Sequence, residues 1–207
     1  MVNTGTIVVA AIGWVLIGLL SGIWMARRGF DALWILLAAP LGPLFVPIAV
    51  ERVRRRPDSA EATPSESLPA GTGPRILIGV DGSPESVHAM TTALRTLGSP
   101  GSALVLAEVV NYEAAESGDG SDMAAATQRL EAAAKRMEVP AAVHTRVLVG
   151  APGTALREFA ERQGFDIVVV GRRGGGLSRH VLGSVSTELV TRSSVPVLVV
   201  EPEREAR

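Results

Sequence analysis

Hydrophobic and polar residues are distributed unevenly along this chain of 207 residues. Two long apolar stretches, at about 6–26 and 32–50, are followed from residue 75 by short apolar runs that alternate with mixed segments. Residues 57–74 (PDSAEATPSESLPAGTGP) between them show no periodicity and are rich in Pro, Ser, Gly and Glu. The pattern therefore predicts an apolar N-terminal region (1–56), a flexible linker (57–74), a folded domain (75–202) and a tail (203–207).

The first apolar stretch has the properties of a membrane-spanning helix. Residues 7–26 carry no charge, and twenty residues at about 1.5 Å each cross the hydrocarbon core of a bilayer. A signal peptide is the alternative reading. However, the start MVNTGT has no basic residue, and Arg27-Arg28 stands where a small-residue cleavage site would be expected. We therefore predict a retained span.

The second stretch contains Pro40, Pro43 and Pro47, which disturb helix geometry, so it is either a kinked span or a re-entrant wedge. Four arginines in 51–56 exceed the charge of the short connection after the first stretch, which favours a transmembrane hairpin with both chain ends inside. A single span with its N-terminus outside leaves the large domain on the same side. Both topologies predict an inner (plasma) membrane protein with a cytoplasmic domain.

Two glycines of the first stretch, Gly18 and Gly22, have the small-xxx-small spacing that lets helices approach closely. The partner helix is either the chain's own second stretch or a second copy of the chain.

The remainder of the chain alternates between strand and helix patterns. Ser83-Pro84 supplies an N-cap and a first-turn proline for the first of these helices, Ser121 is expected to cap the second, and Asn111–Gly120 reads as a polar loop. Strands that alternate with helices in this way form a five-stranded parallel, doubly wound sheet. Strands are predicted at 76–80, 103–110, 141–149, 167–170 and 195–200, and helices at 85–97, 122–137, 152–162 and 184–192.

Composition excludes several kinds of site. The chain has no cysteine, three scattered histidines and a net charge of −1, so we expect no metal site and no nucleic-acid interface. Lys135 is the only lysine, which leaves no lysine for a Walker-type phosphate site.

Candidate chemistry is concentrated in Asp166–Ser184, DIVVVGRRGGGLSRHVLGS. The apolar run 167–170 leads into a loop with glycines at 171, 174, 175 and 176, and Gly183-Ser184 then begins a helix. Backbone N–H groups reach an anion most closely where no Cβ intervenes, and a helix N-terminus adds partial positive charge. The ligand predicted by this pattern is a nucleotide.

Two segments, RILIGVDGSPES at 75–86 and GRRGGGLSRHVLGSVSTELVTRSSVPVLVV at 171–200, resemble the universal stress protein family. The resemblance covers 75–202 and implies an adenine nucleotide alpha hydrolase-like fold. Nucleotide-binding members carry Gly, two residues, Gly, nine residues and then Gly-Ser or Gly-Thr. In this chain Gly171, Gly174 and Gly183-Ser184 follow that pattern with eight residues in place of nine.

The resemblance implies specific roles. It places Val80, Asp81 and Val109 beside adenine and ribose, and Gly171 and Gly174 along the ribose and phosphates. Phosphate contacts fall to Gly183, Ser184 and Val185. Apart from the resemblance, Arg172 and Arg173 in the loop are candidate charge-assisted phosphate donors, and the alternative is that they are exposed arginines with no specific role. Two structural alternatives stay open: Asp81 is also a typical turn residue, and Ser184 a typical N-cap.

The function expected from these features is a membrane-anchored universal stress protein whose cytoplasmic domain binds ATP, AMP or another adenine nucleotide, with or without Mg²⁺. It would act as a regulatory sensor on a membrane partner such as a transporter or channel. The resemblance also implies a homodimer that pairs through Val195–Val200. The alternatives are a scaffold that binds no nucleotide, which the short loop favours, and a slow nucleotide hydrolase. We expect no enzyme, because no carboxylate set converges on the loop.

Overall fold

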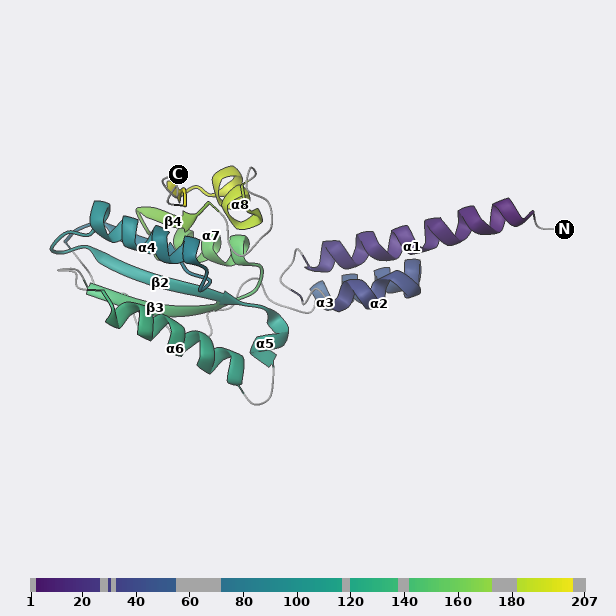
Figure 1. Cartoon of the computed structure of the whole chain (residues 1–207), viewed down its shortest axis with the longest axis horizontal. Coiled ribbons are helices and arrows are strands. Elements are labelled where there is room, and N and C mark those ends of the chain that lie inside the picture. Colours follow the sequence, from purple (N-terminus) through teal and green to yellow (C-terminus); the bar gives the residue numbers. More distant parts are fainter. Residues whose placement is uncertain are drawn as a thin grey trace, which may run out of the picture.

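The computed structural model describes residues 3–26, 30, 33–54, 72–116, 120–137, 142–172 and 182–202. The chain forms a group of N-terminal helices and an α/β domain, which meet at one end of each (Figure 1). Most of the predicted linker, the predicted tail, and Arg173 and Gly174 lie outside the described residues.

The domain is built on a five-stranded parallel sheet in the order β3-β2-β1-β4-β5. Central β1 pairs with β2 on one side, where Ile78 lies opposite Leu106, and with β4 on the other, where it lies opposite Val169. The predicted fold class is therefore confirmed. The strands are β1 (Arg75–Gly79), β2 (Ala103–Val110), β3 (Ala142–Val149), β4 (Ile167–Gly171) and β5 (Val197–Val200).

Helices cover both faces of this sheet, which explains why the inner strands β1, β2 and β4 are apolar along nearly their whole length. One core contains Ile78, Leu106 and Leu130, beneath α4 (Pro84–Leu97) and α6 (Ser121–Lys135). The other contains Leu77, Phe159 and Leu189, beneath α7 (Pro152–Gln163) and α8 (Ser184–Arg192).

Local signals predicted some helix starts correctly and missed others. The Ser83 hydroxyl accepts a hydrogen bond from the N–H of Ser86 and caps α4, as predicted. The predicted cap Ser121 is wrong: the N-cap of α6 is Gly120, in the left-handed region with φ 61°. The predicted loop at 111–120 contains a short helix, α5 (Tyr112–Glu116), which Tyr112 anchors by packing on the domain core.

The N-terminal region contains α1 (Thr4–Ala26), α2 (Leu33–Leu41), a 3₁₀ turn η1 (Gly42–Leu44) and α3 (Phe45–Arg54). Thr4–Ala26 and Leu33–Glu51 are long and apolar enough to be candidate spans, by length and composition alone. The chain reverses between α2 and α3, because Gly42 adopts a φ of 55°. The rings of Trp34 and Phe45 consequently lie with centroids 6.0 Å apart.

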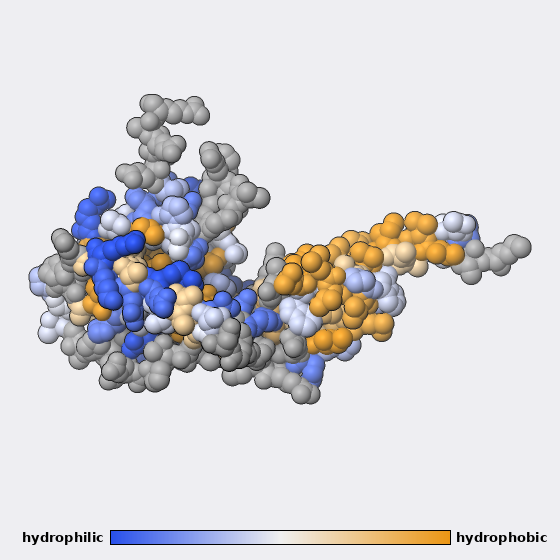
Figure 2. Space-filling view, turned by 60° about the horizontal axis from the view of Figure 1, so that its bottom comes forward, coloured by the Kyte–Doolittle hydropathy of each residue, from blue (hydrophilic) through white to orange (hydrophobic). Residues whose placement is uncertain are grey.

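The Gly18/Gly22 pair packs against the chain's own second stretch. A Cβ on Gly18 would collide with the carbonyl of Ala38, and one on Gly22 would lie 2.9 Å from the Ala38 Cβ and from the Ile35 Cα. The N-terminal part of α1 extends beyond α2, away from the domain (Figure 1). The apolar surface of the molecule is concentrated on these helices (Figure 2) and includes Ile7, Val8, Val9 and Ile12, each more than half exposed.

Candidate functional site

The predicted site residues follow the carboxyl ends of the central strands. From β1 the chain continues to β2 on one side of the sheet and later enters β4 on the other. Such a switch in direction leaves a crevice where α/β proteins bind ligands. Asp81 comes two residues after β1, Val109 lies at the end of β2, and Gly171 is the last residue of β4.

Asp81 stabilises the turn that leads into α4. Its Oδ1 accepts hydrogen bonds from the Ser83 N–H, at 3.0 Å, and from the Ser83 hydroxyl, at 2.5 Å. The turn role considered for Asp81 is therefore real, and the residue is also exposed at the strand edge. Neighbouring Val80 is buried, and its N–H donates to the carbonyl of Ala107 on β2.

The end of β4 is fastened to α8 by one buried hydroxyl. Ser186 Oγ donates to the carbonyl of Gly171 at 2.8 Å and also lies 3.1 Å from the carbonyl of Arg172. The N–H of Gly183 donates to the Arg172 carbonyl at 2.9 Å. Together these bonds hold the two ends of the loop 172–183 next to each other. The pattern of glycines did not reveal Ser186, although its burial on the first turn of α8 makes it the anchor of the loop.

The N-terminus of α8 faces this edge with an exposed serine. Gly183 is the N-cap and has no side-chain cap, so Ser184 is the first helical residue and the cap role considered for it is wrong. Val185 packs on the core beneath the helix. First-turn N–H groups have no partner within a helix, which makes this end suited to an anion.

Arg172 points along the carboxyl edge of the sheet toward the end of β5, the strand next to β4. Its Nη1 lies 2.6 Å from Glu201 Oε1, just after β5, and its N–H donates to the carbonyl of Val200 at 2.7 Å. The side chain is about 29% exposed. A role in phosphate binding would require this ion pair to open.

A buried carboxylate lies beside the site and was assigned no role from the sequence. Glu108 on β2 is 7% exposed and pairs with Arg129 of α6, whose Nε lies 3.1 Å from Glu108 Oε1. This pairing raises the pKa of the Arg129 guanidinium. Because the partner is supplied by α6, the pair attaches α6 to the strand that carries Val109.

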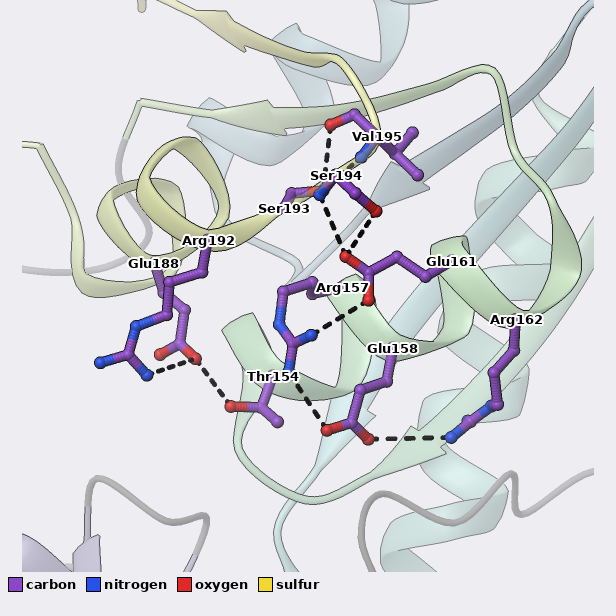
Figure 3. Close-up of polar contacts among 10 residues, drawn as sticks. All are labelled: Thr154, Arg157, Glu158, Glu161, Arg162, Glu188, Arg192, Ser193, Ser194 and Val195. Carbon is purple, nitrogen blue, oxygen red and sulfur yellow. Dashed lines mark hydrogen bonds and ion pairs between the residues drawn. The ribbon is translucent and has the colours of Figure 1, made fainter.

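A polar network on the other face connects α7, α8 and the turn before β5 (Figure 3). Glu161 accepts hydrogen bonds from the N–H and hydroxyl of Ser194, at 3.0 and 2.9 Å, and from Arg157, at 3.0 Å. The Ser194 N–H is the main cause that lowers the pKa of Glu161. Thr154 donates to Glu188 at 2.8 Å, which ties α7 to α8. These contacts join α8 and the turn before β5 to α7.

Comparison with known proteins identifies the domain. Residues 74–201 match the universal stress protein family. The chain belongs to this family. A relative, universal stress protein MJ0531 of Methanocaldococcus jannaschii, is 42% identical over 65 residues, which cover 30% of this chain and 38% of that protein. The aligned region thus spans well under two thirds of this relative.

Solved structures have the same fold. The protein MJ0577 is 26% identical, with a TM-score of 0.54, and the match covers 64% of this chain and 98% of that chain. Other universal stress proteins were solved with ligands: one in complex with cAMP (27% identical, TM-score 0.45, covering 62% and 97% of the two chains) and one from Arabidopsis thaliana with AMP bound (20%, 0.49, 63% and 93%). The matches cover the universal stress protein domain.

Proposed function

We propose that this universal stress protein binds an adenine nucleotide, with ATP as the first candidate, at the carboxyl edge of β1 and β4. The observation that carries the proposal is the arrangement around Ser186, which holds the end of β4 next to the uncapped N-terminus of α8. The helix end supplies N–H groups and partial positive charge for phosphates. Asp81 and Val109 lie at the same edge, where ribose and adenine would be held.

We infer a binding module in place of a hydrolase. Among the residues that the structure describes, no group of three or more His, Cys, Asp or Glu side chains could hold a metal ion. Phosphoryl transfer generally needs a positioned metal and a group that orients water. Nucleotide would instead shift the balance between two conformations of the domain, to the extent that its affinity for them differs.

The apolar helices support membrane anchoring as part of this proposal. α1 has 23 residues, which corresponds to roughly 35 Å of helix, enough to cross a bilayer. Because the chain reverses at Gly42, we propose that α1 alone crosses, with α2 and α3 as a re-entrant wedge on the domain side. The domain would then face the cytoplasm, next to a membrane partner such as a transporter.

A homodimer through β5 completes the proposal. β5 is an edge strand of the sheet, and Val197, Leu198 and Val199 are only partly buried. An apolar edge of this kind is suited to pairing with a second copy. Sedimentation of the detergent-solubilised chain tests this: a Leu198→Lys variant is expected to be monomeric where the unmodified chain is dimeric.

The nucleotide proposal is tested by titrating ATP, with and without Mg²⁺, into the full-length chain by calorimetry. Ser184→Asp places a negative charge where the phosphates would bind and should lower ATP affinity tenfold or more, because like charges a few ångströms apart repel by about 1 to 4 kcal/mol. An acidic residue in the first turn stabilises a helix, so the variant should remain folded.

Ser121→Asp is the matched control. Ser121 is the exposed first residue of α6 and also follows a glycine N-cap, but it belongs to a helix outside the site. This variant should bind ATP as the unmodified chain does. Absence of binding up to millimolar ATP would overturn the proposal and favour the scaffold function. The observation that supports a scaffold is the ion pair of Arg172 with Glu201, which holds this side chain away from a phosphate.

A further inference from the structure

The short helix α5 joins the α/β domain to the N-terminal helices. The indole N–H of Trp34, on α2, donates to Glu113 Oε1 at 3.1 Å, across 79 positions of sequence. The rings of Phe30 and Tyr112 lie beside this bond, with centroids 5.4 Å apart and planes inclined by 50°. We call these four residues the α5 contact.

Tyr112 belongs to two hydrophobic clusters at once. Its side chain packs against the domain core that contains Leu106 and Val110 of β2. It also packs against the N-terminal cluster that contains Met25, Phe30 and Phe45. A side chain that packs in both clusters couples their positions, because close-packed interiors have low compressibility and a shift of one cluster displaces the other.

The α5 contact lies at the edge of the sheet where nucleotide is proposed to bind. Only Asn111 separates β2 from α5, and Val109 comes three residues before Tyr112. In Figure 1 the arrowhead of β2 points toward α5 and the N-terminal helices. The proposed nucleotide edge is therefore directed toward the end of these helices at which α1 and α2 are connected.

We propose that α5 is a docking element that seats the domain on the N-terminal helices, with its nucleotide edge facing the membrane, and that docking and nucleotide binding are linked. Docking restricts the domain to one orientation relative to the N-terminal helices. Linkage is reciprocal: if the α5 contact changes ATP affinity by some factor, ATP changes the docking equilibrium by the same factor. This linkage rests on the proposed nucleotide function, whereas docking does not.

Distance measurements on the full-length chain in phosphatidylcholine/phosphatidylglycerol nanodiscs test the docking. The chain contains no cysteine, so Leu20→Cys on α1 and Gln128→Cys on α6, both exposed, accept nitroxide labels at defined positions. Excess unlabelled chain restricts the signal to distances within one molecule. We expect a single narrow distance distribution, which should broaden in Phe30→Ala/Glu113→Ala and remain narrow in the control Glu131→Ala, an exposed glutamate of α6.

Calorimetric ATP titrations of the same samples test the linkage. The dissociation constant should differ at least threefold between the unmodified chain and Phe30→Ala/Glu113→Ala, with Glu131→Ala unchanged. A distribution in the unmodified chain as broad as that of the double variant would overturn docking. A narrow distribution with ATP dissociation constants equal within twofold would overturn the linkage. If no sample binds ATP, the nucleotide function fails, while the distances still decide whether the domain docks.

Discussion

The indole N–H of Trp14 on α1 donates a hydrogen bond to the carbonyl oxygen of Pro40 on α2, at 3.1 Å. Pro40 lies in the last turn of α2, where backbone carbonyl oxygens find no N–H donor within the helix. Gly42 then reverses the chain, and a Cβ at this position would collide with the Trp14 ring. Helix α1 thus supplies a donor for the Pro40 carbonyl and packs against the turn between α2 and α3.

Replacing Trp14 with Phe should keep most of the ring packing and remove the donor. We expect the free energy of unfolding of the helical region to fall by about 1 kcal/mol, the usual size of such a hydrogen bond in an apolar setting. Circular dichroism during detergent-induced unfolding measures this loss. Leu20→Ala, at a side chain that is 66% exposed, should have a smaller effect; equal losses would mean that the hydrogen bond contributes nothing.

The close contact between α1 and α2 predicts opposite results for two glycines of the same helix. Gly18→Ala inserts a methyl group against the Ala38 carbonyl and should destabilise the helices by about 1–3 kcal/mol, as overpacking does. Gly13→Ala meets nothing within 4 Å and should be neutral or stabilise by up to about 1 kcal/mol, because alanine favours helix. The same unfolding assay compares them. Equal effects would show that α2 does not pack on α1 at Gly18.

The network around Glu161 predicts a pH dependence. Its pKa lies below the usual 4.5 because the folded state stabilises the carboxylate through Ser194 and Arg157. This stabilisation is complete above about pH 4.5 and disappears as the pH falls through the lower folded-state pKa. Glu161→Gln should therefore lower the free energy of unfolding by about 1 kcal/mol at pH 7 and by progressively less below pH 4.5.

Urea unfolding between pH 3 and 7 measures this difference. Glu131→Gln, at an exposed position, should differ from the unmodified chain by nearly the same small amount throughout the range. A loss in Glu161→Gln that does not change with pH would show that the charge of Glu161 is not what stabilises the turn before β5.

The ion pair between Arg172 and Glu201 predicts a gain of affinity. If Arg172 can reach phosphates, Glu201→Gln should release it and raise ATP affinity by up to about fivefold, since exposed pairs are worth at most about 1 kcal/mol. Adenosine, which has no phosphate, should bind equally to both forms. ATP and adenosine titrations measure the two effects. Unchanged ATP affinity in Glu201→Gln would remove Arg172 from the phosphate site.

Local patterns in the sequence were sufficient for much of the domain. The apolar runs at β1 and β4 are continuous, which is typical of strands buried on both faces. Ser83 caps α4 through a hydrogen bond to a residue only three positions away. Such signals act over neighbouring residues, so they can be recognised without the fold. The glycine pattern between β4 and α8 likewise indicated which edge of the sheet carries the candidate site.

The tertiary structure decided what depends on partners distant in the sequence. The loop anchor Ser186, the docking helix α5 and the direction of Arg172 are set by Gly171, by Trp34 and by Glu201, respectively. By itself, the sequence determined the order of apolar and polar segments, and therefore the parallel sheet and the apolar helices. Only the fold determined which side chains meet, because those contacts form between segments that no local pattern connects.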